Sequence, residues 1–109
     1  MFRMLIPALA IGSVLVGCGS AGTPNAPEGD DLLGQGRGIY VSSCRGCHGD
    51  AGGGNRGPNI TGERLSEEYP DIADQIEVVT SGRKGMPSFG DLLDPSEIEA
   101  VVRYTREVL

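Results

Sequence analysis

The sequence is short of the residues that usually build a hydrophobic core or a metal site. Its 109 residues include no Trp, two Phe, three Tyr, three Cys and one His. This length allows at most one domain. A small domain with so few large apolar side chains seldom stabilises itself and usually needs a metal or another staple. The composition therefore predicts a fold that depends on more than its own core.

Basic residues are also few. The chain has 9 Lys and Arg against 15 Asp and Glu, and its formal net charge is −6. Proteins that bind nucleic acid usually carry a basic patch, so the composition argues against a nucleic-acid partner. An acidic surface is also repelled by anionic lipids, so any residence at a membrane must come from an added anchor.

The N-terminal apolar segment is too short for a permanent membrane span. It covers Met4 to Gly17, which is 14 residues, whereas a bilayer span needs about 17 to 25. The positive charge of Arg3 before it is typical of a signal peptide. The sequence then reaches Leu-Val-Gly-Cys at residues 15–18, which resembles the lipobox of bacterial lipoproteins. We expect residues 1–17 to be a lipoprotein signal peptide; the alternatives are an uncleaved anchor or an ordinary signal peptide.

The clearest motif is C-x-x-C-H, formed by Cys44, Cys47 and His48. It is the attachment signature of a c-type haem. Two thiols three positions apart lie on one side of a helical turn, where each can form a thioether with a haem vinyl group. A redox pair, half of a zinc site or a structural disulfide are the alternatives. They fit less well, because no βαβ pattern surrounds the pair and Cys18 is assigned to a lipid. We therefore expect one covalent haem c.

Few residues are available as axial ligands of that haem. His48 is the only His, and Met1 and Met4 belong to the expected signal peptide, so Met86 is the only Met of the mature chain. Met86 follows His48 by 38 residues, which is enough chain to reach the opposite haem face. We predict His48 and Met86 as the two iron ligands. The alternative is that Met86 only fills a gap in the core.

We predict an all-α domain over residues 32–109, preceded by a Gly- and Pro-rich flexible tether over 18–31. The first helix is expected over 32–43, although each of its three glycines costs up to about 1 kcal/mol there. Gly36 or Gly38 would allow another helix to approach closely. No strand is expected.

Two more main helices are predicted. One covers residues 70–81, with Pro70 in its first turn and one buried apolar face made of Ile72, Ile76 and Val79. The last helix begins after Asp94, because Asp94 and Glu97 form a capping box. Its expected packing face consists of Ile98, Val101, Val102 and Thr105. The glycine-rich stretch 49–57 is expected to be an irregular loop.

Over residues 34–109 the chain resembles the small class I cytochromes c, in particular the lipid-anchored ones of bacteria without an outer membrane. Beside C-x-x-C-H, the matching residues are Gly36, Tyr40, Gly57-Pro58-Asn59-Ile60, Gly82-Arg83-Lys84-Gly85-Met86-Pro87 and Tyr104. The resemblance implies that the first and last helices cross near Gly36, Tyr40 and Tyr104. It also implies that the Pro58 carbonyl accepts a hydrogen bond from His48 and so orients that ring.

The resemblance further implies a function. It implies a monohaem electron carrier of a respiratory chain, not an enzyme, with a quinol-oxidising complex as donor and a terminal oxidase as acceptor. It implies a monomer at the outer face of the cytoplasmic membrane, held by acyl chains such as palmitate on Cys18. The alternatives are a catalytic or gas-sensing haem domain with an open sixth position, or a haem subunit of an oxidase complex. Arg56, Asn59 and Arg64 are candidate partners of the haem propionates.

Overall fold

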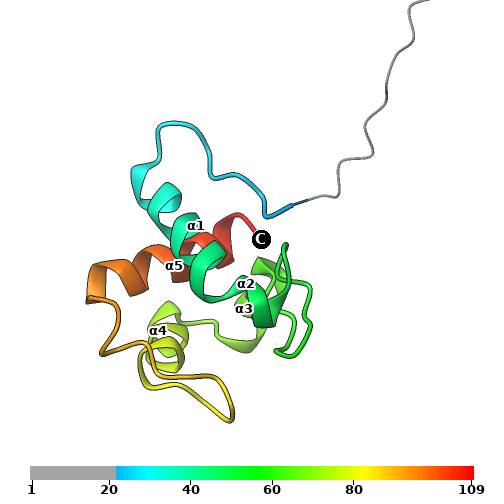
Figure 1. The fold of residues 1–109 in the computed structure, drawn as a ribbon, viewed down its shortest axis with the longest axis vertical. Coiled ribbons are helices and arrows are strands. Elements are labelled where there is room, and N and C mark those ends of the chain that lie inside the picture. The colour runs from blue at the N-terminus through cyan, green and yellow to red at the C-terminus, as the bar shows by residue number, and fades with distance from the viewer. Residues whose placement is uncertain (1–21) are drawn as a thin grey trace, which may run out of the picture.

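The computed structural model of this protein describes residues 22–109, which form five helices around one another (Figure 1). The helices are α1 (Asp31–Ser43), α2 (Arg45–His48), α3 (Gly62–Glu68), α4 (Ile72–Ser81) and α5 (Pro95–Glu107). Within this described range the only strand-like pairing is an isolated bridge between Arg83 and Met86. The all-α prediction is therefore confirmed. The predicted signal peptide and Cys18 lie outside the described residues.

The first and last helices cross in close contact, as the resemblance implied (Figure 1). At the crossing, a Cβ added to Gly36 would lie 2.7 Å from the carbonyl carbon of Ala100 and 2.8 Å from Cβ of Tyr104. Tyr40 and Tyr104 are fully buried beside this point, with ring centroids 5.6 Å apart. Only glycine lets the two backbones approach this closely.

Capping hydrogen bonds determine where these two helices begin. The Asp30 side chain accepts a hydrogen bond of 2.9 Å from the Leu33 amide, so α1 starts one residue earlier than expected. At α5, the Asp94 side chain accepts from the Glu97 amide and the Glu97 side chain accepts from the Asp94 amide. The predicted capping box is thus confirmed, and all four residues of the expected packing face are buried: Ile98, Val101, Val102 and Thr105.

The fourth helix differs from its prediction. It begins at Ile72 rather than in the Pro70 turn, because the Asp71 side chain caps it by accepting from the Ala73 amide at 2.9 Å. The expected buried face is wrong in part, since Ile72 is 36% exposed. The fully buried residue of α4 is instead Gln75, which faces α5 and donates a hydrogen bond to Thr105. A polar contact with a distant helix therefore sets the orientation of α4.

The third helix was not predicted. It packs on α5 through Gly62, where an added Cβ would lie 3.0 Å from the carbonyl carbon of Arg106, and through Leu65, which is buried. The helix has seven residues, and its N-cap residue Thr61 makes no side-chain capping bond. It therefore lacks the length and the capping pattern that reveal a helix in a sequence.

The segment before α1 is not the flexible tether that was expected for it. Within its described part, the Arg37 guanidinium donates to the carbonyl oxygens of Thr23 and Pro24, both at 3.0 Å. The buried Tyr104 hydroxyl also donates to the Pro24 carbonyl, at 2.5 Å. Buried donors need partners, and these two carbonyls supply them. Residues 23–30 therefore belong to the folded domain.

Two glycines of α1 provide a matched test of the helix crossing. Gly36→Ala should lower the free energy of unfolding by about 1 to 3 kcal/mol, because the new methyl group overpacks the contact with Ala100. Gly38→Ala meets nothing within 4 Å and should raise it by about 0.5 to 1 kcal/mol, since alanine favours a helix. Thermal unfolding of the two variants checks this. Equal changes in the free energy of unfolding of the two variants would contradict the close crossing at Gly36.

Candidate functional site

One large apolar cavity, of about 630 Å³, lies beneath the C-x-x-C-H motif. Its wall comes from α2, the loop at 56–60, α3, α4 and the loop at 83–89. The residues that the sequence predicted to attach the haem, bind its iron or orient His48 all line this cavity: Cys44, Cys47, His48, Pro58 and Met86. Of the candidate propionate partners, Arg56 and Asn59 also line it, whereas Arg64 does not.

The two cysteines sit where α1 passes into α2. Cys44 is the cap residue that both helices share, and Cys47 lies in the single turn of α2. Both are free thiols, with Cys47 exposed and Cys44 half-buried. Burial, with the neighbouring Cys47 as a smaller cause, raises the pKa of the Cys44 thiol to about 11. Both thiols thus lie on the cavity wall at adjacent positions.

His48 is held in a defined orientation. Its ring is buried, and Nδ1 lies 2.9 Å from the Pro58 carbonyl oxygen, which is the contact that the resemblance implied. A carbonyl can only accept, so Nδ1 carries the proton and donates it, and Nε2 keeps its lone pair. Gly57 permits this geometry, because a Cβ there would lie 2.8 Å from Cε1 of His48. The ring therefore offers Nε2 as a metal ligand.

The glycine-rich loop after His48 is fastened to the α1–α5 crossing. The Tyr40 hydroxyl donates to the Gly49 carbonyl at 2.7 Å, and the Gly54 amide donates to the His48 carbonyl at 2.8 Å. Burial raises the pKa of Tyr40 to about 12, so its hydroxyl stays protonated and remains a donor. Gly49 itself ends α2 with a φ of 87°, which favours glycine.

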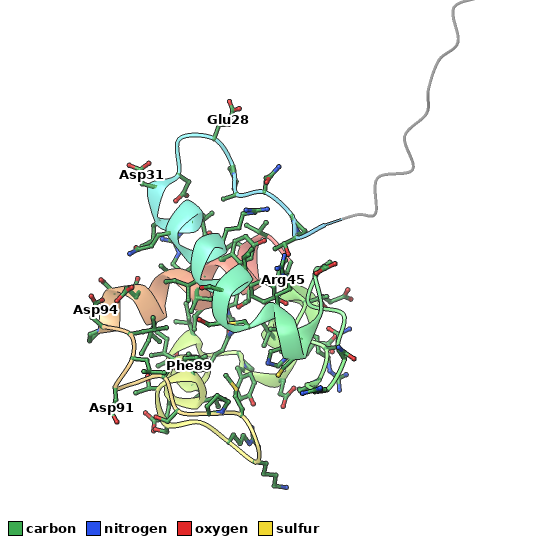
Figure 2. The ribbon with its side chains drawn as sticks, viewed as in Figure 1. Glu28, Asp31, Arg45, Phe89, Asp91 and Asp94 are labelled. Carbon is green, nitrogen blue, oxygen red and sulfur yellow. The ribbon has the colours of Figure 1, made fainter. Side chains whose placement is uncertain are left out.

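Met86 reaches the cavity from a tight turn. The Arg83 and Met86 backbones exchange two hydrogen bonds, of 3.1 and 2.7 Å, and Gly85 between them has a φ of 87°. The turn is tied to α4 by the Phe89 amide, which donates to the Val79 carbonyl at 3.1 Å. Phe89, beside α4 in Figure 2, is buried and lines the cavity too. Met86 thus belongs to the cavity wall and not to the α1–α5 core.

Several residues of the cavity were not singled out from the sequence. They include Leu65, Glu68, Tyr69, Gln75, Val78 and Phe89. Gln75 is the least expected, because a glutamine in a helix usually faces water. The residues around Gln75 in the sequence do not indicate that it is buried, because its partner Thr105 lies on another helix.

The cavity suits a haem that is bound through the motif. Its volume of about 630 Å³ is within the range of cofactor pockets, and its wall is mainly apolar. The wall also holds two thiols, the free Nε2 of His48 and the thioether of Met86. Among residues 22–109 there is no cluster of three or more His, Cys, Asp or Glu side chains that could hold a metal ion directly. No helix in the same range is long and apolar enough to cross a bilayer.

Residues 31–104 match the family model described as cytochrome c oxidase, cbb3-type, subunit III. The chain is 38% identical over 78 residues to the cbb3-type cytochrome c oxidase subunit FixP of Bradyrhizobium diazoefficiens, covering 68% of this chain and 27% of that protein. It is 30% identical over 95 residues to FixP of Azorhizobium caulinodans, covering 83% and 29%. The chain therefore spans less than a third of the length of these curated relatives.

Solved structures with the same fold include cytochrome c6C from Synechococcus, with a TM-score of 0.58 and 33% identity over 67% of this chain and 92% of that chain. Cytochrome c6 from the diatom Phaeodactylum tricornutum has a TM-score of 0.58 and 31% identity over 68% and 90%. The chain thus belongs to the cbb3-type cytochrome c oxidase subunit III family, and it is a class I c-type cytochrome domain that binds covalent haem c.

Proposed function

We propose that this chain is a one-electron carrier in which Cys44 and Cys47 would hold the haem covalently as thioethers and His48 and Met86 would bind its iron. The observation that supports this most strongly is the convergence of these four side chains on one cavity. Cys44 caps α2 and Cys47 lies within it, so both are placed to hold one edge of the group. Met86 reaches the cavity from the loop at 83–89, so its sulfur could bind the iron from another side of the cavity.

Pro58 and Gly57 have supporting roles in this proposal. Pro58 fixes the His48 ring by accepting from Nδ1, and Gly57 leaves space for the ring. A ligand held in this way keeps its orientation, and the hydrogen bond makes Nε2 a stronger electron donor. Arg56 and Asn59, which line the same cavity, are the proposed partners of the propionates.

Axial ligation decides between a carrier and the alternative functions. Haem c, when bound, supplies a reversible one-electron change at iron. With His48 and Met86 as ligands, no position stays open for oxygen, peroxide or carbon monoxide, so we propose electron transfer and no catalysis by this domain alone. A thioether ligand also raises the reduction potential, which suits electron delivery to an oxidase.

The proposed electron path leads from a quinol-oxidising complex to a terminal oxidase. Both FixP proteins are named as subunits of a cbb3-type cytochrome c oxidase, which supports an oxidase as the acceptor. Their names also favour a second candidate, in which this chain is itself a haem subunit of an oxidase complex. We propose the free monomeric carrier first, because all the residues proposed to hold the haem come from this one chain and line the same cavity.

We also propose that Cys18 carries a lipid and holds the domain at the outer face of the cytoplasmic membrane. The motif at residues 15–18 supports this. Thr23 is packed on the domain, and only four residues lie between it and Cys18, so the two Cα atoms are at most about 18 Å apart. The domain would therefore lie close to the membrane, with its N-terminal segment nearest the bilayer.

Replacement of Met86 tests the proposed ligation. Met86→Ala should convert the haem to a high-spin form, lower its potential and allow rapid binding of carbon monoxide, because a ligand is lost. Val78→Ala, which enlarges the same cavity without removing sulfur, should leave the spectrum low-spin. Optical spectra with and without carbon monoxide measure this. Rapid carbon monoxide binding by the unaltered protein, without a far-red sulfur-to-iron band, would favour the gas-sensing or catalytic alternative.

Replacement of Cys18 tests the anchor. Cys18→Ser should move the protein from the membrane fraction to the soluble fraction and leave the haem spectrum unchanged, because the lipid is the only attachment proposed. Ser20→Ala, two residues away, should stay with the membrane. Unaltered protein that is soluble and has no acyl mass on Cys18 would refute the lipoprotein assignment.

A further inference from the structure

A chain of side-chain hydrogen bonds links α5 to the wall of the cavity. Gln75, on α4, lines the cavity and is 5% exposed. Its Nε2 donates to Oγ1 of Thr105 at 3.0 Å, and its Oε1 accepts from Nη1 of Arg106 at 3.2 Å. Both ends of the amide are therefore fixed, and the two α5 residues together determine which way it points.

Arg106 joins three helices at this wall. The same Nη1 also donates to the backbone carbonyl of Tyr69, at 2.9 Å. Tyr69 is the C-cap of α3, where a carbonyl has no partner within its own helix. Because Tyr69 and Gln75 both line the cavity, one guanidinium holds two parts of its wall.

The charge of Arg106 is not neutralised by these contacts. Its partners are an amide and a backbone carbonyl, and both are uncharged. The ion pairs of residues 22–109 are Arg45 with Asp50 and Arg103 with Glu107, so Arg106 takes part in neither. A guanidinium stays protonated at all working pH values. A half-buried charge is screened less by water and salt than an exposed one, so its field reaches further.

We propose that Arg106 is a positioning residue that orients Gln75 at the cavity wall and that its unpaired charge raises the reduction potential of the bound haem. Reduction transfers one electron from a donor protein to this site, and the charge of the site falls by one. A fixed cation nearby favours that change. This inference rests on the proposed electron-transfer function and adds to it a residue that increases the driving force for reduction.

The test is a redox titration of purified holoprotein, followed by its visible spectrum. Arg106→Gln, which keeps a hydrogen-bond donor and loses the charge, should lower the ratio of reduced to oxidised protein at a fixed potential by about tenfold, or about 59 mV for a one-electron couple. Arg106→Lys, which keeps the charge, should restore most of the ratio. Arg103→Gln is the matched control on the same helix, because it removes an equal charge from a residue that bonds only Glu107 and contacts neither Gln75 nor Tyr69. It should shift the ratio far less.

Gln75→Glu is a second variant, which can be measured if Arg106→Gln fails to fold. Gln75→Glu has nearly the same shape and places a carboxylate against Arg106, so it should also lower the potential. Equal shifts in Arg106→Gln and Arg103→Gln, or a fall in Arg106→Lys as large as in Arg106→Gln, would overturn the role of the charge. Unaltered protein with no reversible one-electron couple would overturn the electron-transfer function itself, which distinguishes the two failures.

Discussion

The close crossing of α1 and α5 at Gly36 is the contact on which the rest of this structure depends. It buries Tyr40 and Tyr104 against each other and leaves the end of α1 pointing directly into the C-x-x-C-H turn. Tyr40 then holds the loop that follows His48. The far end of α5 contacts α3 at Gly62 and α4 at Gln75. One helix pair thus positions every wall of the cavity.

Outside that crossing the domain has little apolar core. The largest fully buried side chains are Tyr40, Tyr104 and Val102, and two of these three carry a hydroxyl that needs a partner. Other apolar side chains face the cavity: Leu65 of α3, Val78 of α4 and Phe89 of the Met86 loop. A domain of this size usually requires a staple. Covalent haem supplies the missing apolar centre and two cross-links at once.

Sequence reasoning succeeded where a local pattern carries the information. C-x-x-C-H predicts a haem c without any tertiary context, and the family of the chain confirms that cofactor. The Asp94 capping box lies within one turn, and the structure confirms it. The Gly36 crossing and the contact between His48 and Pro58 required the family resemblance, because their partners are distant or irregular in conformation.

The features that the sequence did not predict also have physical reasons. Helix α3 has no side-chain cap, and the burial of Gln75 depends on α5 residues at least 30 positions away. The segment at 23–30 has the composition of a flexible linker, and its order comes from Arg37 and Tyr104, which supply donors to its carbonyls. Composition cannot reveal such contacts, since it describes a segment without its partners.

We infer that the domain is stable only when the cavity contains its covalent group. Amide hydrogen exchange of the holoprotein, compared with that of the double variant Cys44→Ala and Cys47→Ala, tests this most directly. We expect slow exchange in α1, α4 and α5 of the holoprotein and general loss of this protection in the variant. Equal protection of these helices in both proteins would show that the polypeptide stabilises itself without the covalent group.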